Sequence, residues 1–190
     1  MRAVDQIADP GDRPHAPGRL RLVQEFVNTV DFEHGREVLA DPQRLERRFQ
    51  ELGLEPGPLD ADDLARAIAL REALRRLALA NNGLALEPSA AATIERAARN
   101  AKLTVRLVDG AAELVPKAGG IAGALGTIVA AVYDAMRDGS WPRLKACRRD
   151  VCHWIFWDQS RNRSGTWCHM TVCGNRAKTR AYRRRRAAST

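Results

Sequence analysis

Residues 147–186 read CRRDVCHWIFWDQSRNRSGTWCHMTVCGNRAKTRAYRRRR, and no other part of the chain is so strongly patterned. All four cysteines lie in this stretch, as the pairs Cys147/Cys152 and Cys168/Cys173. Four residues separate the partners of each pair, and fifteen residues separate the pairs. Because each short pair can fold into one turn that aims two thiolates at a common point, this spacing is typical of a tetrahedral zinc site. The sequence therefore predicts one structural zinc ion per chain, held by these four cysteines.

Disulfide bonds and free cysteines in the core are the alternatives to a zinc site. Residues 1–19 contain three aspartates and three prolines but no apolar segment, so they do not have the pattern of a secretory signal. We therefore expect a cytoplasmic protein, in which cysteines stay reduced, and this expectation favours zinc. No apolar run reaches the roughly 18 residues that a membrane-spanning helix needs, so we expect no membrane partner.

The residues beside the cysteines are expected to support the metal rather than bind it. His153 and His169 each directly follow a cysteine, but adjacent residues rarely point at the same metal, and four thiolates already complete the site. Bulky side chains must cover a metal in a module with little core. We therefore expect packing rather than base stacking for the aromatic residues Trp154, Phe156, Trp157 and Trp167.

A basic segment directly follows Cys173. Seven lysines and arginines and no acidic residue lie between residues 176 and 186, mostly among good helix formers. A helix that starts near Asn175 would turn its N-terminal amides toward the thiolates. It would also place Arg176, Arg180, Arg183 and Arg184 on one face. The candidate nucleic-acid contacts are therefore Asn175, Arg176, Lys178, Arg180, Arg183, Arg184, Arg185 and Arg186.

Charge is distributed unevenly along the chain. Residues 141–190 hold 13 lysines and arginines against 2 aspartates and glutamates, whereas the rest of the chain is slightly acidic. A polyanion is the expected partner of the basic end, and a basic helix of this size fits a DNA major groove. Arginine-rich segments serve RNA equally well, and a solvated tail without a specific partner is the third alternative.

The first 140 residues indicate a helical region with one hairpin. Alternating apolar residues around Asp109-Gly110 predict a β-hairpin at about residues 103–115. Helices are expected at residues 20–30, 42–52, 60–81, 88–100 and 121–137. The predicted organisation is a flexible arm (residues 1–18), a helical domain (19–139) and a finger with a basic helix (140–190). The fold class is α+β, mainly α, with a finger that resembles a treble clef or a zinc ribbon.

The longest expected helix, residues 60–81, carries apolar and charged positions at helical spacing. Its core-facing stripe comprises Leu64, Ile68, Leu74, Leu77 and Ala78, and its polar side is expected to hold Arg66, Arg75 and Arg76. Arg71 has two interpretations. It either joins a surface network with its helical neighbours or reaches into the domain to meet a carboxylate or a ligand.

The end of the first helix also has two interpretations. Asn28, Thr29 and Asp31 either cap the helix and the turn that follows, or they line a polar pocket together with Arg71. Capping is the commoner use of such residues.

The chain shows no catalytic pattern. It has no nucleophile set beside a histidine and an acid, no His-Glu-x-x-His helix and no glycine-rich phosphate loop. A four-thiolate zinc site has no open position for a reacting water. We therefore expect no enzymatic activity.

These motifs resemble the CGNR zinc-finger proteins of bacteria, whose N-terminal part is the ABATE domain. The family tetrad is Cys173-Gly174-Asn175-Arg176 in this sequence. The surrounding pattern matches Asp158, Ser160-Arg161-Asn162, Ser164, Trp167-Cys168, Met170, Lys178 and Arg180. Residues 25–29 and 70–75 resemble the two recurring N-terminal motifs, although Phe49 stands where a tryptophan is expected.

The resemblance implies a stress-induced transcription regulator of two parts. The finger and basic helix would bind DNA, favoured over RNA, while the N-terminal domain would sense a small-molecule effector or form a homodimer. Asn28 and Arg71, which belong to the N-terminal motifs, would then lie near each other and line the ligand pocket. The alternative is an RNA-binding or protein-interaction zinc module without sequence-specific DNA binding.

Overall fold

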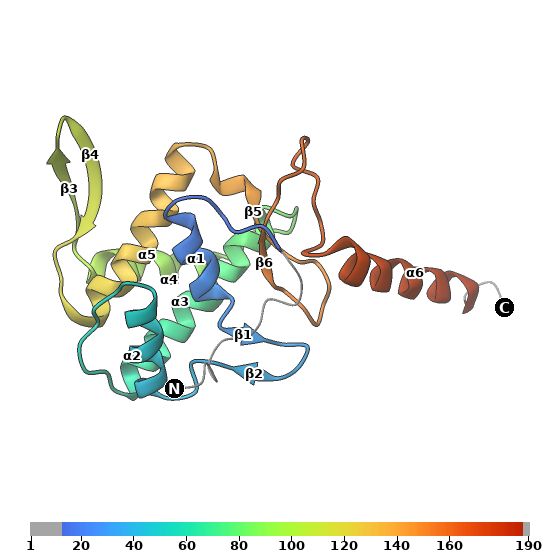
Figure 1. Ribbon diagram of the computed structural model, residues 1–190, viewed down its shortest axis with the longest axis horizontal. Coiled ribbons are helices and arrows are strands. Elements are labelled where there is room, and N and C mark those ends of the chain that lie inside the picture. The colour runs from blue at the N-terminus through green and yellow to red at the C-terminus, as the bar shows by residue number, and fades with distance from the viewer. Residues whose placement is uncertain (1–12, 188–190) are drawn as a thin grey trace.

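The computed structural model describes residues 13–187 of the 190-residue chain, without the side chains of Ala181, Arg184, Arg185 and Ala187. Its helices are α1 (Leu20–Val27), α2 (Pro42–Glu51), α3 (Ala61–Ala80), α4 (Pro88–Asn100), α5 (Gly120–Arg137) and α6 (Asn175–Ala187). Its strands form antiparallel pairs: β1 (Val30–Asp31) with β2 (Arg36–Glu37), β3 (Leu103–Val108) with β4 (Ala111–Pro116), and β5 (Leu144–Ala146) with β6 (Ile155–Trp157). A 3-10 turn, Trp141–Arg143, precedes β5, and a π turn, Met170–Gly174, precedes α6. The predicted α+β class, mainly α, is confirmed (Figure 1).

Local capping signals set most helix bounds where they were predicted. α2 begins at Pro42, and the Asp41 side chain accepts a hydrogen bond from the Arg44 amide. α3 begins with a capping box, in which Asp60 and Asp63 each accept from the other's backbone amide. α1 is shorter than predicted and ends at Val27, because the chain turns at residue 28 and enters β1.

The predicted hairpin is also confirmed. β3 and β4 pair from Leu103 opposite Pro116 to Val108 opposite Ala111. Asp109 and Gly110 at the turn have φ angles of 49° and 77°, the positive values that a tight hairpin turn requires. The hairpin stands out from the helices at one end of the molecule (Figure 1).

The apolar core lies between α1, α3 and α5, and α2 and α4 pack against it. Phe26 of α1 and Phe49 of α2 are fully buried, and their ring centroids lie 5.7 Å apart. Phe49 therefore fills the position at which the resemblance to CGNR proteins predicts a tryptophan. Its burial shows that phenylalanine completes the local packing here.

One prediction for α3 is wrong. Arg66 and Arg76 are exposed, as expected, but Arg75 is only 2% exposed rather than on the polar side. It is buried because its guanidinium finds the main-chain carbonyl oxygens of Val27 and His153. The apolar stripe is also displaced, since Leu70 is buried whereas Leu64 and Ile68 are half-buried.

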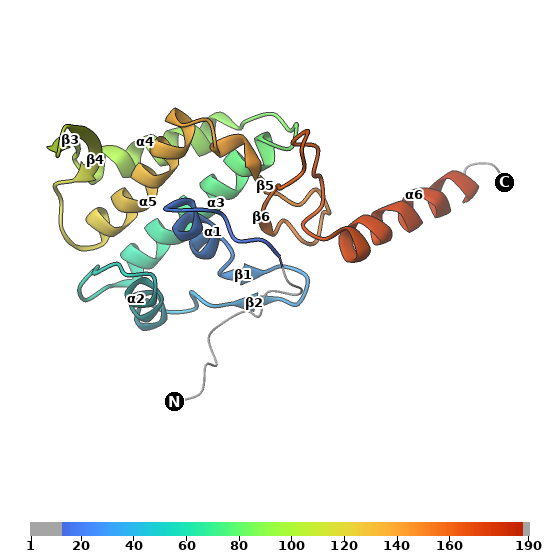
Figure 2. The ribbon, with the colours of Figure 1, turned by 45° about the horizontal axis from the view of Figure 1, so that its top comes forward.

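The finger shares its core with the helices. Trp141, Leu144, Ala146 and Ile155 are buried in the same apolar cluster as the residues of α1, α3 and α5. β5 packs against α3, and β6 packs against α1. α6 leaves this body at the end opposite the hairpin, and it projects into solvent as far as the described chain extends (Figures 1 and 2). None of the described helices is both long and apolar enough to cross a lipid bilayer.

The predicted flexible arm needs a correction at its end. Residues 1–12 lie outside the described residues, but residues 13–18 are held against the body. Ala16 is buried, and its amide donates to Gln24 Oε1 at 2.6 Å. Arg13 lies over the ring of Trp154, with its guanidinium carbon 5.2 Å from the ring centroid. The packed part of the chain therefore begins before α1.

Candidate functional site

The four cysteines converge on one point. Their sulfur atoms all lie within 4.8 Å of one another, and all four residues are free thiols. The sulfur of Cys168 lies 3.6 Å from those of Cys152 and Cys173, far longer than the roughly 2.05 Å of a disulfide bond. Zinc bound to four thiolates at about 2.3 Å in a tetrahedron would separate the sulfurs by about 3.8 Å. The cluster therefore has the dimensions of a four-thiolate zinc site.

Short turns place each cysteine. Cys147 follows β5, and its amide donates to the Trp154 carbonyl at 2.9 Å. Cys173 lies in the π turn, where its amide donates to the His169 carbonyl at 2.9 Å. An added Cβ at Gly174 would lie 2.5 Å from Met170 Sδ and 3.2 Å from Trp167 Cδ1. Glycine after the last cysteine therefore allows Met170 and Trp167 to pack closely against the backbone.

Hydrogen bonds among the thiols couple their ionisation. They lower the pKa of Cys147 and Cys173 and raise the pKa of Cys152 and Cys168, because one ionised sulfur disfavours another close by. A divalent cation removes this conflict, since it allows all four thiols to ionise. The donor set thus fits zinc, and the four cysteines would hold it as a closed structural site.

Three of the four aromatic residues cover the sulfurs as predicted, whereas Trp157 packs against the helical core instead. Trp154 and Phe156 are buried in the same cluster as the cysteines, and Trp167 packs against it. His153 and His169 are not among the residues that form the sulfur site. His169 Nδ1 lies 2.8 Å from Thr171 Oγ1, and the His153 carbonyl accepts from Arg75.

A buried ion pair organises the loop between the two cysteine pairs. Lys145 Nζ donates to Asp158 Oδ2 at 2.8 Å, and their side chains are 5% and 3% exposed. Asp158 also accepts from the amides of Ser160 at 2.9 Å and Gly165 at 2.8 Å. Burial acts to raise the pKa of Asp158, but the hydrogen bonds from Lys145, Ser160 and Gly165 outweigh it and lower the pKa to about 2. An added Cβ at Gly165 would lie 2.6 Å from Asp158 Oδ1, so glycine is required there.

Two asparagine side chains hold the edges of the β5–β6 sheet. Asn28 donates to the Ile155 carbonyl and accepts from the Ile155 amide, both at 2.8 Å. Asn82 donates to the carbonyls of Ala146 at 2.9 Å and Thr166 at 3.0 Å. These amides take the place of neighbouring strands. They fix the finger to the ends of α1 and α3.

Two buried arginines of α3 complete this junction. Arg75 donates to His153 O at 2.9 Å and to Val27 O at 2.6 Å. Arg71 is 3% exposed, and its two terminal nitrogens donate to the Glu37 carboxylate at 2.7 and 2.8 Å. Arg71 therefore meets a carboxylate inside the domain. It also joins a network with its helical neighbours, since its Nε donates to Glu72, which accepts from Arg75 as well. The polar groups of Asn28 and Arg71 thus have protein partners, and a ligand pocket at these residues stays a prediction.

A basic groove lies between residues 148–151 and the first turns of α6. Its volume is about 630 Å³. Its lining includes Trp167, Asn175, Asp150 and five arginines: Arg148, Arg149, Arg176, Arg180 and Arg183. Arg176, Arg180 and Arg183 share one side of α6, as the helical spacing predicts. Lys178 and Arg186 are exposed, whereas the side chains of Arg184 and Arg185 lie outside those the structure describes.

Acidic residues already pair with arginines that line the basic groove. Glu33, in the loop between β1 and β2, accepts from both terminal nitrogens of Arg149, at 2.7 and 2.8 Å, and also from Arg176. Asp150 accepts from Arg180 at 3.2 Å. Hydrogen bonding from Arg149 lowers the pKa of Glu33, and Arg176 reinforces the shift.

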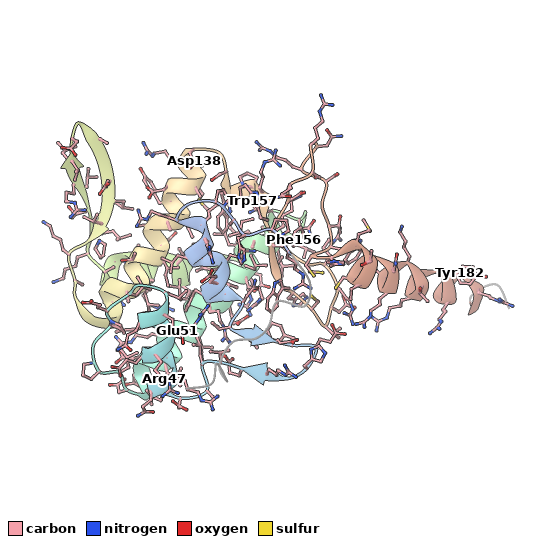
Figure 3. All side chains as sticks on the ribbon, in the orientation of Figure 1. Arg47, Glu51, Asp138, Phe156, Trp157 and Tyr182 are labelled. Carbon is pink, nitrogen blue, oxygen red and sulfur yellow. The ribbon has the colours of Figure 1, made fainter. Side chains whose placement is uncertain are left out.

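The start of α6 differs from the prediction in one respect. The amide of Asn175 donates to the carbonyls of Met170 and Val172 and therefore does not turn toward the thiolates. The π turn that carries Cys173 runs directly into α6, so the metal site orients the helix through its backbone. Sulfur atoms (yellow) lie at the base of α6 in Figure 3, and Tyr182 marks its outer half.

Two family models match the chain, one after the other. Residues 20–139 match the ABATE model, described as "Putative stress-induced transcription regulator", and residues 143–186 match the CGNR zinc finger. The chain belongs to the ABATE family. The predicted order, an ABATE domain followed by a CGNR finger, is confirmed. No curated protein matches the chain significantly.

Sequence reasoning missed several residues at the site. Arg148 and Arg149 of the CGNR finger line the basic groove, and Glu33 of the ABATE domain pairs with Arg149 and Arg176. The spacing of Arg148 and Arg149 beside Cys147 could have suggested their proximity to α6. Glu33 and Asn82 carry no such signal, because their partners lie 116 and 64 residues away along the chain.

Proposed function

We propose that this protein is a zinc-dependent transcription regulator whose basic groove and α6 bind duplex DNA. The observation that carries the proposal is the convergence of five arginines on one groove at the root of a projecting helix. The 13 residues of α6 correspond to about 20 Å of helix. Such a helix fits the major groove of B-DNA, which is about 12 Å wide.

Double-stranded RNA fits this shape less well. The major groove of A-form RNA is deep and narrow, and side chains do not reach its base edges. Asn175, in the first turn of α6, is our candidate for a contact with a base edge, because an amide group pairs with adenine in the major groove. The arginines of the groove and α6 would contact phosphates, which position the protein without reading sequence.

Direct competition tests this assignment. A labelled duplex bound to the zinc-loaded protein is challenged with unlabelled duplex DNA, single-stranded RNA and heparin at matched phosphate or sulfate concentrations. We expect duplex DNA to compete best and zinc removal to abolish binding. Equal competition by all three would contradict DNA preference and favour a nonspecific polyanion site, while preference for RNA would favour the alternative RNA-binding module.

We further propose that the ABATE domain senses a small molecule. A pocket of about 320 Å³ lies between α3, α4 and α5, and its walls include Leu70, Ile121 and Leu125. Arg66 and Arg96 also line it, so an apolar molecule with an acidic group suits its chemistry. Replacing Ala97 in the wall with phenylalanine should abolish any thermal stabilisation that such acids give the wild-type protein. If such acids raise the thermal midpoint of the variant as much as that of the wild type, the ligand binds elsewhere.

We propose a binding role rather than a catalytic one. Four thiolates would leave zinc without an open coordination position. This feature supports the expectation that the chain is not an enzyme. The homodimer expected from the resemblance stays a prediction, to be measured by sedimentation of the zinc-loaded protein with and without DNA.

A further inference from the structure

Arg149 and Arg176 approach one anion from two different elements. Arg149 lies in the turn that follows Cys147, and Arg176 lies in the first turn of α6. Both donate to the carboxylate of Glu33, and Arg149 does so with two nitrogens, at 2.7 and 2.8 Å. Two converging guanidinium groups of this kind also bind the oxygens of a phosphate.

The cysteine cluster holds Arg149 in place. Arg149 Nη1 lies 3.8 Å from Cys173 Sγ as well as 2.7 Å from Glu33 Oε2. The side chain of Arg149 is 15% exposed, and that of Glu33 is 26% exposed. The guanidinium is therefore fixed between a zinc ligand and the carboxylate. Glu33 itself remains open to exchange with a solvent-borne anion.

We propose that Arg149 and Arg176 form a phosphate-binding site for the nucleic-acid backbone, and that Glu33 occupies this site in the free protein. The inference rests on the proposed function, because it assigns one contact within the basic groove. A phosphodiester offers the same single negative charge and paired oxygens as the carboxylate. Nucleic acid therefore displaces Glu33 when it binds.

This exchange connects the two domains. Glu33 belongs to the ABATE domain, whereas both arginines belong to the CGNR finger. The neighbouring Phe32 contacts the junction: its ring lies 4.9 Å from the Arg75 guanidinium carbon and 6.1 Å from the His153 ring. A change in the position of the β1–β2 loop would thus alter how readily the phosphate site opens.

Glu33→Gln tests the proposal in the full-length, zinc-loaded protein. Removing the competing charge should tighten binding to a duplex by about two- to fivefold, the range expected for a partly exposed ion pair. The logarithm of the affinity should also fall more steeply with the logarithm of the salt concentration, by about one in slope. The reason is that the phosphate then displaces salt anions from the two arginines rather than Glu33. Glu113→Gln is the matched control: it removes the same charge from a pair with Arg106 on the β3–β4 hairpin, and it should change affinity less than twofold.

A double-mutant cycle separates competition from a structural role. Arg149→Ala should weaken binding more in the Glu33→Gln background than in the wild type, because in the wild type its phosphate contact replaces an existing ion pair. Zinc content and the thermal midpoint show whether each variant is folded, and Glu33→Ala provides a second test of the same charge. Binding by Glu33→Gln and Glu33→Ala that is no tighter than that of Glu113→Gln would overturn the proposal. Weaker binding would instead make Glu33 a positioning residue.

A second probe keeps the inference distinct from the proposed function. If nucleic acid binds neither the wild type nor Glu33→Gln, the proposed function fails. The phosphate site is then tested with inorganic pyrophosphate alone. Pyrophosphate should shift the Nε–H nuclear magnetic resonance signal of Arg149 in Glu33→Gln at lower concentrations than in the wild type. Equal concentration dependence in the two proteins would overturn the phosphate site.

Discussion

At the scale of single residues, close packing around charged groups explains the finger's most specific positions. Asp158 is buried and accepts from Lys145 and from two main-chain amides. Gly165 is required because any side chain there would meet the same carboxylate. The resemblance to CGNR proteins identified Asp158 as a family position. Its role depends on a lysine 13 residues earlier, which no local pattern indicates.

Asp158→Asn should therefore destabilise the finger strongly. The variant leaves the Lys145 ammonium buried without its carboxylate, and the loss of one partner of a buried pair costs about 3–5 kcal/mol. Zinc release in a denaturant titration measures the effect. Asp150→Asn, which breaks the exposed pair with Arg180, is the control and should leave zinc retention nearly unchanged. A finger that keeps zinc equally well in both variants would contradict a structural role for the buried pair.

At the scale of elements, the sequence predicts what local signals determine. Asp41-Pro42, Asp60 and Asp109-Gly110 set the starts of α2 and α3 and the β3–β4 turn because capping and turn chemistry involve only nearby residues. The β5–β6 sheet depends instead on partners distant in the chain. Asn28 is separated from Ile155 by 127 residues and Arg75 from His153 by 78. Helical spacing alone consequently misplaced Arg75.

Zinc removal should disorder some elements and spare others. The sulfur cluster packs with Trp154 and Phe156, whereas Leu144, Ala146 and Ile155 belong to the helical core. Hydrogen exchange after chelation should show lost protection at residues 166–180, while α3 and α5 keep theirs. Metal ligation in small zinc modules contributes on the order of 10–16 kcal/mol to folding. Uniform loss of protection across the chain would mean that the ABATE domain also depends on zinc.

At the scale of the whole molecule, charge and shape act together. The ABATE domain and the root of the finger form one body, and α6 extends from it with its described side chains largely in solvent (Figure 1). The composition of residues 141–190 predicts a polyanionic partner, and the fold gathers five arginines of this region into one groove. The sequence does not reveal that Glu33 pairs with arginines of this groove, because Glu33 lies 116 residues before Arg149.

The central claim is that the basic groove binds DNA phosphates, and a salt titration on one duplex tests it most directly. The titration compares the wild type with a groove variant, Arg180→Ala/Arg183→Ala, and a control variant, Arg99→Ala/Arg106→Ala. For each protein, the logarithm of the affinity falls with the logarithm of the salt concentration by about 0.9 per phosphate contact. The account predicts that the groove variant lowers the magnitude of the slope by up to about two, while the control, with the same loss of charge on α4 and β3, keeps the wild-type slope. Indistinguishable slopes for all three proteins would contradict the account.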